Sequence, residues 1–174
     1  ESDTAAIQPG STYSPVTLTG PGVLGTLKIN LDAGNSNYSQ MGQELAMRIY
    51  IDGRKEPNVA AAVDDFFCDP FGLGQTKAFP IRSVGNTRYC YFPMPFKKSL
   101  RIELANESER PVKISCKAEY TSEILLDKYY EFFARYHREF ATEDRKEPFT
   151  LFQAKGQGHF VGTSLVTNSG GKGV

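Results

Sequence analysis

The two histidines, His137 and His159, and the adjacent acids Asp64 and Asp65 are the first candidates for chemistry in this sequence. Asp64 and Asp65 are neighbours, and neighbouring residues of a strand point to opposite faces, so their carboxyls do not converge on one substrate bond. A turn or end-of-strand role is predicted for both. A nucleophile–base pair or a metal site would require the fold to bring His137 and His159 together, or to bring one of them to a carboxylate.

A ligand pocket is the binding role that remains for these polar residues. His137 lies in a run of charged residues, which is more typical of a solvated, ion-paired strand face. His159 lies between a glycine and a phenylalanine, where it either packs at an edge or lines a pocket. We assign no catalytic, metal-binding or cofactor-binding residue. The weak pocket candidates are Asp65, Arg135, His137 and His159.

The three cysteines do not form a metal or redox motif. Cys68, Cys90 and Cys116 lie too far apart in the sequence for a zinc-site or redox spacing. Cys116 alternates with Val112, Ile114 and Ala118, which predicts that it points into a core as a small apolar side chain. One disulfide with one free thiol stays open as an alternative.

The charge balance excludes two kinds of partner. Twenty Lys and Arg residues match twenty Asp and Glu residues, so the chain has no net charge and no long-range field that would collect nucleic acid or an anionic membrane. Short basic pairs such as Lys97-Lys98 are separated and balanced by acids, so nucleic-acid binding is not predicted. No apolar run approaches the roughly 20 residues that cross a bilayer, so membrane insertion is not predicted either.

The start of the chain suggests export. The first residue is Glu1 rather than Met, and we expect a processed protein that is secreted or at the cell surface. The tripeptides that begin at Asn37 and Asn106 are acceptor sequons for N-glycosylation, although such tripeptides also arise by chance.

Short alternating segments dominate the sequence and predict strands. In residues 23–31, for example, Leu27, Ile29 and Leu31 alternate with polar residues. Pro93 and Pro95 cannot donate ladder hydrogen bonds, so that segment should lie at an edge or between strands. Many short strands with regular turn signals predict an all-β, antiparallel two-sheet jelly roll. The predicted strands include 15–19, 23–31, 45–51, 87–92, 99–104, 112–120, 129–140, 149–155 and 159–167.

The chain is predicted to have one domain with an appendage at each end. The domain spans residues 14–167, and residues 168–174 form a Gly-rich tail. Residues 1–13 form an N-terminal arm without an amphipathic pattern, either frayed or ordered only against a neighbour. The residues that would anchor such an arm are Ala5, Ala6, Ile7 and Tyr13.

Several motifs resemble one known family, in the same order and at similar spacing. They are 20–24 (GPGVL), 49–53 (IYIDG), 65–67 (DFF), 90–96 (CYFPMPF), 102–106 (IELAN) and 156–162 (GQGHFVG). The chain resembles, over Pro15 to Val166, the family catalogued as DUF2961, which includes glycoside hydrolase family 172. The 90–96 run is the specific part of this resemblance.

The resemblance implies two consecutive jelly rolls, of which this chain resembles the first. In the family, the acidic pair proposed for glycoside cleavage lies in the second jelly roll, so the resemblance carries no catalytic residue onto this chain. We therefore expect a non-catalytic, self-assembling structural subunit of an extracellular fibre, tube or shell, with the N-terminal arm adding a strand to a neighbouring copy. The alternatives are a carbohydrate-binding module, and a furanoside-acting glycoside hydrolase that is truncated or completed across subunits.

Overall fold

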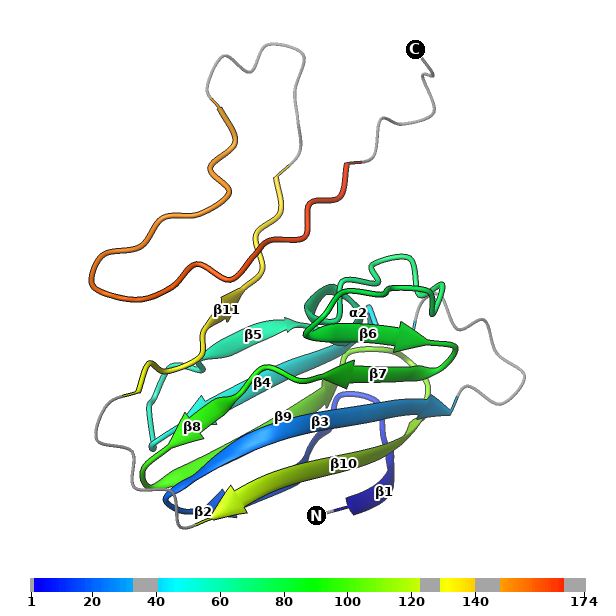
Figure 1. Ribbon diagram of the computed structural model, residues 1–174. Helices are drawn as coiled ribbons and strands as arrows, with labels where there is room; N and C mark the ends of the chain where they lie inside the picture. The colour runs from blue at the N-terminus through cyan, green and yellow to red at the C-terminus, as the bar shows by residue number, and fades with distance from the viewer. Residues whose placement is uncertain (1, 33–40, 123–128, 140–147, 168–174) are drawn as a thin grey trace. The chain divides into compact units, whose positions relative to one another are not determined.

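The structure is a computed structural model that describes residues 2–32, 41–122, 129–139 and 148–167 (Figure 1). Its strands form two largely antiparallel sheets that do not close into a barrel. The predicted all-β sandwich of the jelly-roll type is confirmed. Helix α2, Val63–Phe66, is a single turn. No helix among the described residues is long and apolar enough to cross a membrane.

The first sheet has six strands. They are β1 Ser2–Ile7, β3 Gly22–Asp32, β6 Ile81–Val84, β7 Thr87–Cys90, β8 Met94–Phe96 and β10 Val112–Ser122. The order β1-β10-β3-β7-β6 places β1 and β6 at the two edges. β8 pairs with β3 alone, with Pro95 opposite Val23, so the proline-containing segment lies at an edge as predicted. Strand β6 was not among the predicted strands.

The second sheet has five strands. They are β2 Thr12–Thr19, β4 Leu45–Ile51, β5 Val59–Ala62, β9 Ser99–Asn106 and β11 Ala134–Arg135. Their order is β11-β5-β4-β9-β2, and β11 runs parallel to β5 while the other neighbours are antiparallel. Helix α2 follows β5 directly, so the sheet leads into the polar residues of the helix.

The core lies between the sheets and follows the predicted alternation. In β3, Leu27, Ile29 and Leu31 are at most 2% exposed, and the polar residues between them are half-buried. In β10, the side chain of Cys116 is buried in the same way, together with Val112, Ile114 and Ala118. The predicted register of β10 is confirmed. All three cysteines are free thiols, so the disulfide alternative is not realised in this structure.

The N-terminal segment belongs to the chain's own sheet, which corrects the expectation of a separate arm over residues 1–13. β1 pairs along its whole length with β10 of the same chain. The side chain of Ile7 is 3% exposed, and Tyr13 lies in β2 opposite Leu104. The physical reason is that the open edge of β10 offers backbone hydrogen-bond partners close at hand, so an extended segment of low amphipathicity is ordered by pairing rather than by its own pattern.

The three strands predicted near the C-terminus do not form as predicted. Of residues 129–139, only Ala134–Arg135 is a strand, and residue 140 lies outside the described residues. The segments 149–155 and 159–167 are neither strand nor helix. Alternation shows which face of a strand would be buried, but a strand also needs a partner edge to satisfy its backbone groups. Those two segments have no such partner among the described residues.

The chain divides into two compact units, Glu1–Tyr136 and His137–Val174. All the strands named above and helix α2 lie in the first unit. In the second unit, every described residue is exposed. The Gly-rich tail predicted over 168–174 lies outside the described residues.

Candidate functional site

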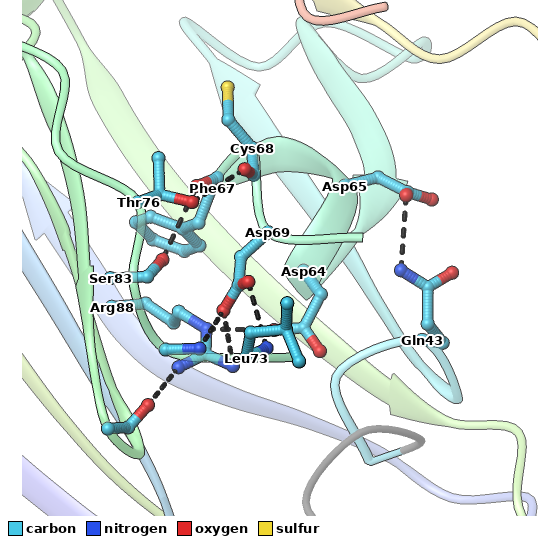
Figure 2. Close-up of polar contacts among 12 residues, drawn as sticks. Gln43, Asp64, Asp65, Phe67, Cys68, Asp69, Leu73, Thr76, Ser83 and Arg88 are labelled. Carbon is cyan, nitrogen blue, oxygen red and sulfur yellow. Dashed lines mark hydrogen bonds and ion pairs between the residues drawn. The ribbon is translucent and has the colours of Figure 1, made fainter. Parts of the chain in front are cut away.

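A buried cluster of three charges lies inside the first unit. Asp64 comes from α2, Asp69 from the loop that follows it, and Arg88 from β7. Figure 2 shows the Arg88 guanidinium beside both carboxylates. The three side chains are between 0% and 5% exposed, so the cluster is sealed from solvent. Charges so deeply buried are found almost only where they are paired.

The guanidinium of Arg88 is held by three partners. Its Nε lies 2.8 Å from Oδ1 of Asp64, and one terminal nitrogen lies 3.2 Å from Oδ2 of Asp69. The other terminal nitrogen donates to the carbonyl oxygen of Gly85 at 2.6 Å. These contacts tie α2, the following loop and the β6–β7 turn to one another.

Asp69 shapes the loop as well as pairing with Arg88. Its carboxylate accepts hydrogen bonds from the backbone N–H groups of Leu73 at 3.0 Å and Gly74 at 2.8 Å. Gly74 has a φ of 62°, and a Cβ there would lie 2.3 Å from the carbonyl oxygen of Gly85. Only glycine fits this close approach without displacing backbone. The loop is therefore built onto the turn at Gly85.

Asp64 is the member of the cluster that is least satisfied. Its Oδ2 is buried and has no hydrogen-bond partner among the residues that the structure describes. Burial raises the pKa of Asp64 to about 6, although the charge of Arg88 opposes the shift. A Cβ at Gly42 would lie 2.1 Å from the Asp64 carboxyl group, so the backbone at position 42 packs directly against it. A buried oxygen without a partner costs free energy in the charged state.

This cluster is suited to holding structure rather than to reacting with a substrate. The side chains of Asp64 and Asp69 are at most 5% exposed, so a substrate does not reach their carboxylates. Both carboxylates are also already paired with the guanidinium of Arg88. Among the described residues, no group of three or more His, Cys, Asp and Glu side chains could hold a metal ion. Sequence reasoning missed the cluster because Arg88 becomes the partner of Asp64 only through tertiary packing of β7 against α2.

Asp64 and Asp65 point to different partners, as their predicted separation requires (Figure 2). Asp64 faces Arg88, whereas Oδ1 of Asp65 accepts a hydrogen bond from the Gln43 side chain at 3.1 Å. The strand geometry assumed for the prediction is wrong, because both residues lie in the helical turn α2. They do stand at the end of a strand, since α2 begins directly after β5.

The four pocket candidates have different surroundings. Asp65 contacts Gln43, and Arg135 donates to the backbone carbonyl oxygens of Pro57 and Asn58 at 3.0 Å and 2.8 Å. His137 and His159 belong to the second unit. There Nε2 of His137 lies 2.7 Å from Oε1 of Glu139, and His159 is exposed. A pocket role for these four residues stays a prediction.

Residues 129–135, which we call the clamp segment, dock along the edge of the second sheet. The backbone N–H of Ala134 donates to the carbonyl oxygen of Asn58 at 3.1 Å. The ring of Phe132 packs between Phe66 and Phe92, with centroid distances of 6.3 Å and 5.1 Å. Aromatic contacts of this kind add to simple area burial. The clamp segment is thus held by both backbone and side-chain contacts.

Asn58 is the polar anchor of the clamp segment. Its side chain is fully buried, and its Oδ1 accepts a hydrogen bond from the N–H of Ile51 at 3.1 Å. Its Nδ2 donates to Glu131 at 3.3 Å, and Glu131 in turn lies 2.8 Å from Arg54. Both ends of a buried amide are satisfied in this way, as a stable interior requires.

The turn at Asp52-Gly53 contacts the start of the clamp segment through the hydroxyl of Tyr129. Both residues have positive φ, 55° and 74°, as the central residues of a type I′ turn do, and the Arg54 N–H donates to the carbonyl oxygen of Ile51 at 3.3 Å. The predicted turn role of Asp52 is confirmed. The Asp52 carboxylate accepts backbone N–H groups from Lys97 at 2.8 Å and Lys98 at 2.6 Å, and the hydroxyl of Tyr129 at 3.1 Å. Burial raises the pKa of Asp52, but these hydrogen bonds outweigh it and lower the pKa below its ordinary value.

The first unit is a largely antiparallel β-sandwich of the jelly-roll type that encloses a buried charge cluster and carries the clamp segment along one edge of its second sheet. A family model described as GH172 domain-like matches residues 1–118, which is more than half of the chain. The chain belongs to this family, and the resemblance seen in its motifs is confirmed over that range. The motif at 156–162 lies beyond the match. No curated protein matches the chain.

Proposed function

We propose that this chain is a non-catalytic structural subunit that associates with copies of itself in an extracellular fibre, tube or shell. The observation that carries the proposal is the apolar surface of the second unit, where residues 148–167 form no strand or helix and are all exposed. A run of exposed large apolar side chains marks an interaction site. Those more than a third exposed are Phe149, Leu151, Phe152, Phe160, Val161, Leu165 and Val166.

A second copy of the chain is the partner that this surface suits. Extended segments satisfy their backbone groups by adding to the edge of a sheet, and each copy offers the edge strands β1 and β6. β1 carries small side chains at Thr4, Ala5 and Ala6, and no Lys or Pro that would block an added strand. The chain has no net charge, so copies do not repel each other over long range.

The N-terminal strand enters this proposal in a changed form. Because β1 pairs with its own β10, we propose its outer edge as an acceptor for a neighbouring copy. The exchange of β1 itself between copies stays a prediction.

A glycoside hydrolase is the competing function, and the family relation supports it only at that coarse level. Glycosidases use two carboxyl groups about 5 to 9.5 Å apart that reach the substrate. Asp64 and Asp69 both contact Arg88 and both are buried, which supports a structural role for them. We expect no hydrolysis of arabinofuranosides or fructofuranosides. Turnover that is lost when a carboxylate of this chain is substituted would contradict the proposal.

The association is tested with light scattering after size-exclusion chromatography, over a range of protein concentrations. The double variant Phe152→Ser and Phe160→Ser removes two exposed rings of the second unit, whose centroids lie 4.7 Å apart. We expect it to shift the wild-type oligomer toward the monomer. Phe79→Ser is the matched control, since Phe79 is 99% exposed in the first unit. A monomeric wild type, or a double variant that associates like the wild type, would overturn the proposal.

A further inference from the structure

Two parallel tyrosine rings lie on the outer face of the first sheet. Tyr89 is in β7, and Tyr91 comes directly after the strand, two residues further on, with its ring stacked on that of Tyr89. Their ring centroids are 6.2 Å apart and the ring planes differ by 11°. Tyr91 is 44% exposed. The intervening Cys90 is 1% exposed, which places the tyrosines on the face opposite the core.

A row of basic residues crosses the sheet at the level of Tyr89. In the strand register, Tyr89 is opposite Arg82 of β6 on one side and Lys28 of β3 on the other, and Lys28 is opposite Lys117 of β10. Residues opposite each other in register share a face of the sheet. The Lys28 ammonium lies 5.6 Å from the Tyr89 ring centroid, within the range of a cation–π contact.

The positive charge of this row is only partly neutralised. The ammonium of Lys117 lies 2.6 Å from the carboxylate of Glu119. Neither Lys28 nor Arg82 forms an ion pair with a carboxylate among the described residues. Arg82 is exposed and Lys28 half-buried, so both cations are available to a ligand that lies across the rings.

We propose that this tyrosine platform, defined by Tyr89, Tyr91, Lys28 and Arg82, binds an acidic glycan. The C–H face of a sugar ring is apolar and packs on an aromatic ring whose face is electron-rich. The carboxylate of a uronic acid pairs with a planar guanidinium through two parallel hydrogen bonds, and with an ammonium as a point charge. In the platform, the guanidinium of Arg82 and the ammonium of Lys28 lie on the two sides of Tyr89 in one row. This arrangement matches a ligand that alternates apolar sugar faces with negative charge.

A single-stranded nucleic acid also combines flat rings with negative charge, but it suits this chain less well. Nucleic-acid binding rests on a broad positive field that neutralises several phosphates. This chain has no net charge, and on this face Glu119 already neutralises one of the cations. A glycan needs only the local pairing that Lys28 and Arg82 supply.

Binding is measured by isothermal titration calorimetry and affinity gel electrophoresis with a short oligogalacturonate. Its fully methyl-esterified form is the neutral match and oligo(dT) is the nucleic-acid match. We expect the acidic oligosaccharide to bind, Tyr91→Ala to bind about fivefold to tenfold more weakly, and Arg82→Ala to weaken binding and its salt dependence. The control variants are Tyr130→Ala, an exposed tyrosine elsewhere, and Lys113→Ala, a lysine of the same sheet outside the row. Both should bind like the wild type.

Three results would overturn this proposal. They are the absence of oligogalacturonate binding, equal binding of the methyl ester, and tighter binding of oligo(dT) through the same residues. Melting temperatures show whether each variant is folded, which is expected because Arg82 and Tyr91 are exposed. The association state is measured in the same buffer, so failure of glycan binding and failure of self-association are separate results.

Discussion

At Asp64, the free-energy cost of burying a carboxylate is offset only in part by its ion pair with Arg88. Its Oδ1 contacts Arg88 at 2.8 Å, while its Oδ2 has no hydrogen-bond partner within the described part of the chain. The cluster of Asp64, Asp69 and Arg88 carries two negative charges and one positive charge when fully ionised. Protonation of Asp64 therefore relieves both the unsatisfied oxygen and the excess charge, and this makes the cluster sensitive to pH.

The first prediction is a pH-dependent stability that disappears in Asp64→Asn. The folded-state pKa is raised to about 6, above an unfolded value of about 3.9. The contribution of Asp64 is therefore fully present below about pH 4 and is lost as pH rises through about 6. The shift corresponds to about 3 kcal/mol. Urea denaturation should show the free energy of unfolding of the wild type falling by about this amount relative to Asp64→Asn between about pH 4 and 7.

Asp65→Asn is the control for that measurement. It keeps the contact between Asp64 and Arg88 and removes only the last of the causes that raise the pKa of Asp64, of which burial is the largest, so most of the wild-type pH dependence should persist. A constant difference between the wild type and Asp64→Asn at every pH would contradict the prediction.

The second prediction concerns Cys116. Cys116→Ser places a hydroxyl in apolar surroundings and should lower the free energy of unfolding by about 1 to 3 kcal/mol. Burial raises the pKa of the Cys116 thiol to about 12, so the native thiol should react slowly with maleimides. The half-buried Cys68 serves as the internal comparison. Rapid labelling of Cys116 in the folded protein would show that the register of β10 is wrong.

At the scale of single residues, the sequence predicted which side chains point into the core better than which side chains contact each other. The alternation around Cys116 depends only on the period of the strand, and it was enough to place that side chain in the core. Asp64 could be excluded from a catalytic pair with Asp65, but its contact with Arg88 joins residues 24 positions apart. No local pattern encodes such a pairing, because it arises from the way β7 packs against α2.

At the scale of elements, Asn106 joins the first strand to the rest of the sandwich. It is the last residue of β9, and its side chain is 1% exposed. Its Nδ2 donates to the carbonyl oxygens of Ile7 at 2.9 Å and Arg110 at 2.8 Å, and its Oδ1 accepts from the Ser108 hydroxyl at 2.7 Å. One side chain thus satisfies the end of β1 and the turn before β10. Although it begins a sequon, its amide nitrogen is not accessible for glycosylation in the folded chain.

The third prediction is that Asn106→Ala loosens β1. The substitution leaves the carbonyl oxygens of Ile7 and Arg110 without their buried donor, which should cost about 1 to 3 kcal/mol. Hydrogen exchange of the β1 amides should be faster in Asn106→Ala than in the wild type, whereas exchange in the core strand β4 should change less. Asn30→Ala is the control, since Asn30 is half-buried and its side chain donates to the hydroxyl of Thr87, away from the carbonyl oxygens of Ile7 and Arg110. Unchanged protection of β1 in Asn106→Ala would contradict this assignment.

The strands predicted best are those with a neighbouring strand on both sides, whereas the edge strands β1 and β6 were missed. The strands now seen as β3, β4, β9 and β10 were predicted close to their observed bounds, because each alternates and each has a neighbour on both sides. β1 was missed because its order comes from the edge of β10 rather than from its own residues. Segments 149–155 and 159–167 alternate well enough to predict strands, yet neither segment pairs with a strand among the described residues.

At the scale of the whole molecule, the exposed apolar residues of the second unit and the absence of net charge act in the same direction. Apolar side chains gain free energy when a partner covers them, and equal numbers of basic and acidic residues remove the long-range repulsion that keeps many proteins apart. Association through these residues should therefore respond to solvent conditions in the way that apolar contacts do.

The last prediction uses that response to identify what drives the proposed association. Apolar contacts are little affected by salt screening, whereas exposed ion pairs weaken as the Debye length falls from about 14 Å to about 4 Å between 0.05 M and 0.5 M NaCl. The mean size from light scattering should stay constant over that range and increase on adding ammonium sulphate, which strengthens apolar burial. Phe152→Ser with Phe160→Ser should remove the sulphate response, because those rings are 57% and 58% exposed and free to be covered. Dissociation of the wild type by NaCl alone would show instead that ion pairs between the copies hold them together.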